Sequence, residues 1–202
     1  MRASLEAGVR DERVLDAIRA VPRAGFVPPE SVDRAYEDAP LPIPHGQVTT
    51  QPSLVARMVE GLGLRGGERV LEVGTGYGWQ TALLARLAGE VFSLERFPDL
   101  AETARGALLE AGVENATIVV GDGSAGLPER SPFDAVLVAA AFPSVPPPLR
   151  DQLAARGRLL QPIGPGGADD VTLFVKDEHG LRAVRTLVPA HFVRLYGEHG
   201  FG

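Results

Sequence analysis

Short apolar runs alternate with segments of helical periodicity from residue 54 to residue 162, and this alternation constrains the fold more than any other feature. The apolar runs have the composition of buried strands, and each is followed by a segment long enough for a crossover connection. Parallel neighbouring strands require such crossovers. We therefore predict an α/β fold with a doubly wound, mostly parallel sheet and helices on both faces. The predicted strands are residues 69–73, 91–95, 116–120, 133–139 and 158–162, and the predicted helices are residues 54–62, 79–88, 98–111 and 146–154.

The alternation changes beyond residue 167. Residues 171–176 and 187–195 look like two further strands, and no long helix can be placed between them. Such a pair predicts an antiparallel hairpin at one edge of the sheet. We expect a single domain of residues 1–202. Within it, residues 1–53 form a helix and a covering loop, residues 54–167 form the α/β core, and residues 168–202 form the last strands.

The N-terminal part contains a helical pattern followed by a long proline-rich segment. Val14, Leu15, Ile18 and Val21 repeat at helical spacing, and the next residue is a proline. Residues 38–52 are so dense in proline that they cannot join the middle of a helix or a sheet, so we predict an extended loop. Long loops in compact domains are often functional, which makes this one a candidate lid or substrate-binding segment. A plain N-terminal wrap is the alternative.

Composition narrows the classes of function. Cysteine is absent, and the four histidines have no metal-ligand spacing, so we expect no metal. The formal net charge of -6 argues against a nucleic-acid partner, because binding to phosphates needs a positive surface. No apolar run is long enough for a membrane span, and the N-terminus lacks the apolar core of a secretory signal. We expect a cytoplasmic monomer with no membrane partner.

The strongest local motif is Val73-Gly74-Thr75-Gly76-Tyr77-Gly78, which ends the first predicted strand and opens a helix. Glycines at such a place allow a sharp turn and bring backbone N–H groups close to a ligand at the helix N-terminus. The order G-x-G-x-G differs from the G-x-G-x-x-G fingerprint of dinucleotide-binding proteins. The motif therefore favours a nucleoside ligand without a pyrophosphate, and a tight turn without any ligand is the alternative.

Two acidic residues follow at the carboxyl ends of later strands, where ligands bind in open α/β sheets. Glu95 ends the second strand about twenty residues after the glycines, the spacing at which a carboxylate accepts hydrogen bonds from ribose hydroxyls. Asp122 ends the third strand, and Asp122-Gly123 can accept from an adenine amino group and donate to a ring nitrogen. Separately, Glu95 could be a surface partner of Arg96, and Asp122 could be a turn residue. Together with the glycine motif they indicate a nucleoside site.

With these motifs placed, residues 11–196 resemble the protein-L-isoaspartate (D-aspartate) O-methyltransferase family. The proline-rich segment and the Gly121-Asp122-Gly123-Ser124 segment are particular to this family, whereas many methyltransferases share the glycine motif. The segments that carry the resemblance are Val21-Pro22-Arg23, Phe26-Val27-Pro28, Ala35-Tyr36-Glu37-Asp38, His45-Gly46-Gln47 through Gln51-Pro52, the glycine motif, Ser93-Leu94-Glu95-Arg96, Gly121-Asp122-Gly123-Ser124 with Gly126, Ala139-Ala140-Ala141, Val145-Pro146, Gln152-Leu153 and Pro162-Ile163-Gly164.

The resemblance implies a Rossmann-like, seven-stranded methyltransferase fold that uses S-adenosyl-L-methionine and releases S-adenosyl-L-homocysteine. The implied partners are damaged proteins and peptides with isoaspartyl residues, whose free carboxylate is methylated to initiate repair. The implied cofactor contacts are Val48, Thr49, Thr50, Gly74, Thr75, Gly76, Gly78, Glu95, Arg96, Asp122 and Gly123. The implied substrate cleft contains Pro42, Ile43, Ala140, Ala141 and Val145.

The catalytic serine of the family aligns with Thr50. The usual Ile-Ser is Thr49-Thr50 in this sequence, so the hydroxyl is kept and a methyl group is added. Methyl transfer to a carboxylate that is already ionised needs alignment rather than a general base, so we assign Thr50 to orienting the carboxylate and leave His45 without a catalytic role. Two alternatives stay open: a methyltransferase of the same fold with another substrate, and a relative that binds the cofactor without catalysis.

Overall fold

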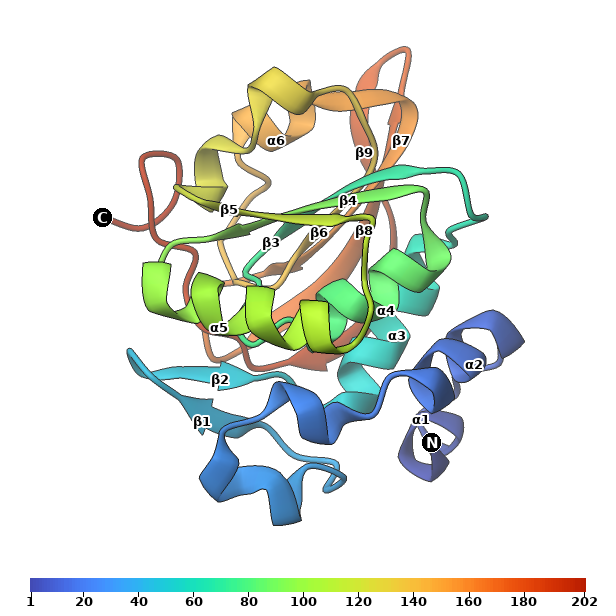
Figure 1. Ribbon diagram of the computed structural model, residues 1–202. Coiled ribbons are helices and arrows are strands. Elements are labelled where there is room, and N and C mark those ends of the chain that lie inside the picture. Colours follow the sequence, from blue (N-terminus) through green and yellow to red (C-terminus); the bar gives the residue numbers. More distant parts are fainter.

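The computed structural model describes residues 1–202 as a central seven-stranded sheet with helices on both faces (Figure 1). The strands are β3 (Arg69–Val73), β4 (Glu90–Glu95), β5 (Ala116–Val120), β6 (Phe133–Val138), β7 (Leu153–Ile163), β8 (Asp169–Asp177) and β9 (Gly180–Ala190). Their order is β5-β4-β3-β6-β7-β8-β9, in which β3 to β7 are parallel, while β8 is antiparallel to both of its neighbours. The predicted α/β class with an antiparallel edge is confirmed.

The helices form two layers of unequal size. Three helices cover one face of the sheet: α3 (Pro52–Leu62), α4 (Trp79–Leu87) and α5 (Pro98–Glu110). The N-terminal helices α1 (Arg2–Glu6) and α2 (Glu12–Ala20) pack outside this layer, against α3 and α4. The other face carries α6 (Pro147–Asp151) and a smaller core around Phe133 and Leu149 (Figure 1). Short 3-10 helices are η1 (Arg23–Phe26), η2 (Pro29–Arg34), η3 (Gly123–Ala125) and η4 (Pro128–Arg130). The helices are all too short or too polar to span a lipid bilayer.

The predicted helix 146–154, the strand that follows it and the last strand differ from the structure. The predicted helix 146–154 is the five-residue α6, because Leu153 instead begins β7 by pairing with Phe133 of β6. The last strand was predicted at residues 187–195 but is β9, Gly180–Ala190. It is an edge strand with much of its surface exposed, so charged residues such as Arg182 and Arg185 are tolerated where a buried strand would exclude them.

The proline-rich segment contains a short hairpin that the sequence did not predict. Strand β1 (Leu41–Ile43) pairs antiparallel with β2 (Gln47–Thr49). His45 and Gly46, at the centre of the connecting turn, both have positive φ, as in the tight turns that suit two-residue hairpin loops. Pro42 is tolerated because a two-stranded ladder consists only of edge strands. This hairpin is the covering segment over the site.

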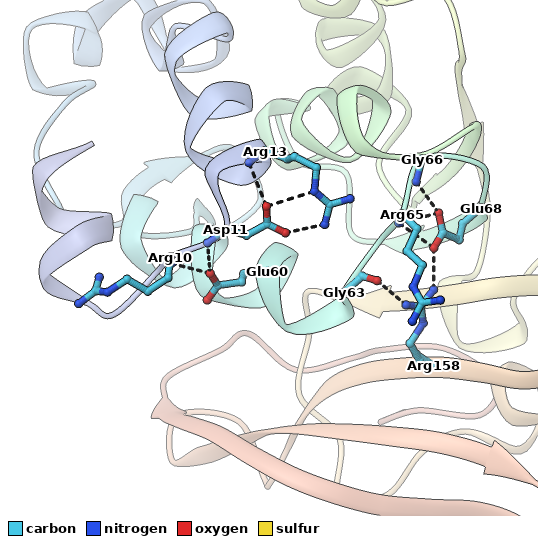
Figure 2. Close-up of polar contacts among 9 residues, drawn as sticks. All are labelled: Arg10, Asp11, Arg13, Glu60, Gly63, Arg65, Gly66, Glu68 and Arg158. Atoms are coloured by element: carbon cyan, nitrogen blue, oxygen red, sulfur yellow. Dashed lines mark hydrogen bonds and ion pairs between the residues drawn. The ribbon is translucent and has the colours of Figure 1, made fainter.

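Polar contacts anchor the N-terminal helices and the turn after α3 to the core (Figure 2). The Glu60 carboxylate accepts hydrogen bonds from the backbone N–H groups of Arg10 and Asp11 at 2.6 and 2.7 Å. Glu68 accepts from the backbone N–H of Arg65 and from the guanidinium of Arg158, both at 2.9 Å. Glu60 lies on α3, and Glu68 directly precedes β3.

Glu68 is expected to stabilise the fold at neutral pH and to lose that effect in acid. Burial alone would raise its pKa, but the N–H of Arg65, the Arg158 guanidinium and the N–H of Gly66 lower the pKa to about 2. This folded-state pKa lies below the ordinary pKa of 4.5. The contribution of Glu68 to the free energy of unfolding is therefore complete above pH 4.5 and disappears as the pH falls to about 2. Replacing Glu68 by glutamine should lower the free energy of unfolding by about 1–3 kcal/mol at pH 7.

Urea unfolding at a series of pH values measures this effect. The difference between wild type and Glu68→Gln should shrink as the pH falls from 4.5 to about 2. Glu178→Gln is a matched control, because the Glu178 side chain is 85% exposed and the same replacement there should change stability little. A Glu68→Gln difference that does not vary with pH would contradict the assignment.

Candidate active site

A first cavity opens at the carboxyl ends of β3, β4 and β6. It has about 950 Å³ of space free of protein atoms, open solvent at its mouth included. Its lining combines the glycine loop with the covering hairpin and with the segment after β9. The main lining segments are residues 47–50, 73–80, 94–97, 139–140 and 193–196. Segments far apart in the sequence thus meet at one edge of the sheet, as expected for open α/β folds.

The glycine loop presents unpaired backbone donors to this cavity. Gly74, Gly76 and Gly78 all have positive φ, a conformation that costs other residues strain. The N–H groups of Thr75 and Tyr77 find no acceptor within the chain, although both residues line the cavity. With the N-terminus of α4 directly behind them, these donors favour an anionic or carbonyl group of a ligand.

Glu95 ends β4 beside this loop, and its side chain is buried. One carboxylate oxygen accepts from the N–H of Gly76 at 2.9 Å, and the other accepts from the N–H of Phe97 at 3.1 Å. A carboxylate can accept about four hydrogen bonds, so Glu95 keeps acceptor capacity toward the cavity that it lines. Glu95, which the sequence predicts to accept hydrogen bonds from ribose hydroxyls, therefore also holds the glycine loop in place.

A buried polar network under the loop was not identified from the sequence. Glu72 of β3 is fully buried, and its carboxylate accepts hydrogen bonds from Gln80, Thr81 and Ser93. Burial raises the pKa of Glu72 to about 7, although these hydrogen bonds oppose the shift. The Thr75 hydroxyl lies 2.5 Å from that of Ser93, so it is turned into the network. The backbone of Thr75, rather than its side chain, is available to a ligand.

Asp122 and Gly123 behave differently from each other. Gly123 lines the first cavity, whereas Asp122 does not. Both oxygens of the Asp122 carboxylate accept hydrogen bonds from the chain itself, from Ser124 at 2.7–2.8 Å and from the N–H of Glu198 at 2.7 Å. Gly123 is therefore open to the cavity, whereas the Asp122 carboxylate is bound by Ser124 and by the backbone of Glu198.

The two threonines of the covering segment have different surroundings. The Thr49 hydroxyl accepts from the Arg23 guanidinium at 2.6 Å and from the backbone N–H of Leu41. The Thr50 hydroxyl makes no hydrogen bond within the chain, and only its backbone carbonyl is bound, by Arg23 at 3.1 Å. Thr50 therefore offers a free donor in the cavity, and Thr49 is part of the scaffold.

Arg23 organises the covering segment from inside. The side chain is buried and donates to the carbonyl groups of Ala35, Glu37 and Ala39 in addition to the two threonines. Burial lowers its pKa to about 10, so the guanidinium stays charged at neutral pH. In the sequence, Arg23 stands out only as part of the family segment Val21-Pro22-Arg23. Its structural role could not be predicted, because nothing local to an isolated arginine indicates that it will be buried.

His45 also has a structural environment. Its ring stacks on Phe97 with a centroid separation of 4.1 Å, and its Nε2 lies 2.9 Å from both carboxylate oxygens of Asp99. The hydrogen bond with the His45 ring lowers the pKa of Asp99. These bonds tie the turn of the hairpin to the start of α5. His45 does not line either cavity, which agrees with leaving it out of the catalysis.

A second cavity adjoins the first. Four residues line both cavities: Val48, Thr50, Ala139 and Val193. The second cavity continues along residues 188–193, at and beyond the end of β9, and along the start of α3, including Arg57. Thr50 thus lies where the two spaces meet.

Most of the predicted cofactor residues, but fewer of the predicted substrate residues, line the first cavity. Ten of the eleven predicted cofactor contacts line the first cavity, and Asp122 is the exception. Of the predicted substrate residues, Ile43 and Ala140 line the first cavity. Pro42, Ala141 and Val145 line neither: Pro42 is exposed on β1, Ala141 is fully buried, and Val145 packs against the smaller core. No group of three or more acidic or histidine side chains in the structure is placed to hold a metal ion.

Comparison with known proteins gives a consistent result. The family model described as protein-L-isoaspartate(D-aspartate) O-methyltransferase matches residues 1–200. A protein-L-isoaspartate O-methyltransferase from Anaeromyxobacter dehalogenans (strain 2CP-C) is 54% identical, with 93% of this chain and 91% of the relative covered. One from Methanoculleus marisnigri is 49% identical, with 96% of this chain and 88% of the relative covered.

Solved structures agree on the fold. A protein-L-isoaspartate O-methyltransferase structure superposes with a TM-score of 0.85 and 31% identity, covering 98% of this chain; the chain spans 65% of that protein's length. A candidate protein-L-isoaspartate O-methyltransferase from Plasmodium falciparum, in complex with S-adenosyl-L-homocysteine, gives a TM-score of 0.82 at 24% identity, with 95% of this chain and 94% of that chain covered.

Proposed function

Because the chain belongs to the protein-L-isoaspartate (D-aspartate) O-methyltransferase family, we infer that it methylates damaged proteins and peptides. It transfers a methyl group from S-adenosyl-L-methionine to the free carboxylate of L-isoaspartyl and D-aspartyl residues, which initiates repair. The observation that carries this function is the position of Thr50, whose unpaired hydroxyl lies where two cavities meet. One cavity suits a nucleoside cofactor, and the other suits a peptide.

The residues of the first cavity fit S-adenosyl-L-methionine. The free N–H groups of Thr75 and Tyr77 can bind the carboxylate of its amino-acid part, and Glu95 can accept hydrogen bonds from its ribose hydroxyls. Gly123 can donate its backbone N–H to an adenine nitrogen. When bound, this cofactor supplies a methyl group that leaves a positively charged sulfur for a carboxylate oxygen. That reaction needs neither a carboxylate of the enzyme acting as a base nor a metal ion.

The chain's own task is to bring the substrate carboxylate into line. An aspartyl-type carboxylate has a reference pKa of about 3.9 and is ionised at neutral pH, so no residue has to remove a proton. We propose that the Thr50 hydroxyl donates a hydrogen bond that orients this carboxylate. Arg23 fixes the backbone of Thr50 through its carbonyl. The covering hairpin excludes water, which leaves the carboxylate less hydrated and more reactive.

We propose that the peptide approaches through the second cavity. Residues 188–193 line it in an extended stretch that leaves β9, and Ala139 and Val193 lie at its junction with the first cavity. Pro42, Ala141 and Val145 line neither cavity, and their part in the substrate cleft stays a prediction. Ile43 and Ala140 remain as walls of the reaction centre. The single-domain organisation, the monomeric state and the cytoplasmic location stay predictions.

The proposed function is tested with two synthetic peptides that differ only in an isoaspartyl or a normal aspartyl residue. We expect a base-labile methyl ester on the isoaspartyl peptide, with kcat/KM about tenfold or more above that of the aspartyl peptide. The two peptides differ by one backbone carbon, so the discrimination must come from aligning the carboxylate while the shifted backbone fits the cleft. Equal labelling of both peptides would reject this substrate.

A further inference from the structure

The segment after β9 ends in a turn, residues 195–202, that docks against the loop after β5. The backbone N–H of Glu198 donates to the Asp122 carboxylate at 2.7 Å. The N–H of His199 donates to the Ser124 hydroxyl at 2.9 Å. The partners are 76 and 75 residues apart in the sequence, so these are tertiary contacts. Both come from the backbone and do not depend on which side chains the turn carries.

The 195–202 turn has one shape that permits this docking. Gly197 has a φ of 150°, and a Cβ atom at this position would collide with the Asp122 carboxylate and the Ser124 hydroxyl. The turn closes on itself, because the N–H of Phe201 donates to the carbonyl of Leu195 at 2.7 Å. The Phe201 ring also packs edge-on against Phe142 at 5.1 Å. The turn is therefore held at both ends.

The docked turn acts on a loop that reaches the first cavity. Ser124 is fully buried and donates through both its N–H and its hydroxyl to the same Asp122 oxygen. Burial opposes ionisation of Asp122, but the N–H of Glu198 and the Ser124 donors outweigh it and lower the pKa of Asp122. Gly123, between these two fixed residues, lines the cavity together with Leu195 and Tyr196. The position of Gly123 thus depends on what holds its neighbours.

We propose that the 195–202 turn is a positioning element of the cofactor site, which fixes Gly123 at the nucleoside end of the cavity by holding Asp122 and Ser124. The inference rests on the proposed function, because it takes the cofactor to bind in the first cavity. It gives the Asp122 carboxylate a different role from the adenine acceptor expected from the sequence. Asp122 binds the turn, and the turn orders the loop.

Gly197→Ala tests the inference, because its methyl group removes the docked geometry and leaves every cavity residue unchanged. We expect the dissociation constant for S-adenosyl-L-homocysteine, measured by calorimetry, to rise about tenfold, the loss expected when Gly123 no longer makes one backbone hydrogen bond to the cofactor. The peptide KM and the turnover at saturating cofactor should stay within about twofold. Gly180→Ala is the matched control, since Gly180 has a φ of 118°, outside the left-handed helical region, and has no atom within 4 Å of an added Cβ. It strains the backbone at a residue that lines neither cavity, so cofactor affinity should not change.

A pair of shortened chains tests the same inference without a steric clash. A chain that stops after Gly197 lacks both donors and should bind S-adenosyl-L-homocysteine as weakly as Gly197→Ala. A chain that stops after Phe201 lacks only the exposed Gly202 and should bind like wild type. Unchanged affinity in Gly197→Ala and in the shorter chain would overturn the inference alone. Equal losses of cofactor and peptide affinity would also overturn it, by making the turn a general packing element. If wild type fails to bind S-adenosyl-L-homocysteine, the proposed function falls and the inference with it.

Discussion

Valine in place of Thr50 is expected to lower kcat/KM for an isoaspartyl peptide about 10–200-fold, the loss expected for one hydrogen bond to a charged group. Valine keeps the branched shape of threonine and removes only the donor. Because the Thr50 hydroxyl makes no hydrogen bond within the chain, its loss should not destabilise the fold. Thr50→Ser keeps the donor and should retain most of the activity. Initial rates on the isoaspartyl peptide, with calorimetry of S-adenosyl-L-homocysteine binding, measure both effects.

The neighbouring residue supplies a control of the same chemistry. Thr49→Val removes an acceptor from the buried Arg23 guanidinium, so it should lower the free energy of unfolding by about 1–3 kcal/mol. Thr50→Val should lower turnover and leave stability unchanged, whereas Thr49→Val should mainly lower the free energy of unfolding. Full turnover by Thr50→Val would make Thr50 a packing residue of the loop. If wild type and the Thr50 variants bind cofactor but none turns over, the chain is a relative that binds without catalysis.

Alanine in place of Glu95 is expected to weaken binding of S-adenosyl-L-homocysteine by about 1.5–3 kcal/mol, or roughly 10–150-fold. The variant loses the proposed ribose acceptor. It also leaves the N–H groups of Gly76 and Phe97 without their partner, which loosens the glycine loop. Calorimetry measures the affinity, and thermal unfolding without ligand shows how much of the loss comes from the loosened loop.

Glu102→Ala is the matched control for Glu95. Glu102 lies on α5 with a side chain 79% exposed and pairs only with Arg105, so its removal should leave cofactor affinity unchanged. Glu95→Gln keeps a carbonyl acceptor and should lose less affinity than Glu95→Ala. Unchanged affinity in Glu95→Ala would remove Glu95 from the cofactor site.

The parallel strands could be predicted from the sequence because each is a short run rich in apolar and β-branched residues. β3, Arg69–Val73, was predicted with its observed bounds, and so was β5. Prediction failed where tertiary contacts override local composition. β9 has charged residues that only an edge strand accepts, and the β1–β2 hairpin has a proline in a ladder of edge strands. Leu153 belongs to β7 because Phe133 lies beside it, which no local pattern shows.

In the candidate site, too, features that depend on the local sequence could be predicted, and features that depend on tertiary contacts could not. Glycine positions could be predicted because their conformation depends on the local backbone, and Glu95 because it is the last residue of a buried strand. Other parts of the site depend on partners far away in the sequence. The Asp122 carboxylate accepts from the N–H of Glu198, 76 residues away, and Arg23 donates to acceptors in two separate stretches of chain, residues 35–39 and 49–50. Burial of Glu72 likewise follows from the whole fold.

The tight turn of the hairpin also decides which of two consecutive threonines meets the substrate. Side chains alternate along an extended strand, so Thr49 contacts Arg23 while Thr50 lies at the junction of the cavities. A slip of one residue in strand pairing exchanges the two sides of a strand. A slip in one direction would put Thr49 at the junction and Val48 against the arginine, and a slip in the other would put Thr50 against the arginine and Gln51 at the junction. Each slip keeps one of the two hydroxyl contacts and loses the other, so a turn of unchanged length is needed to keep both.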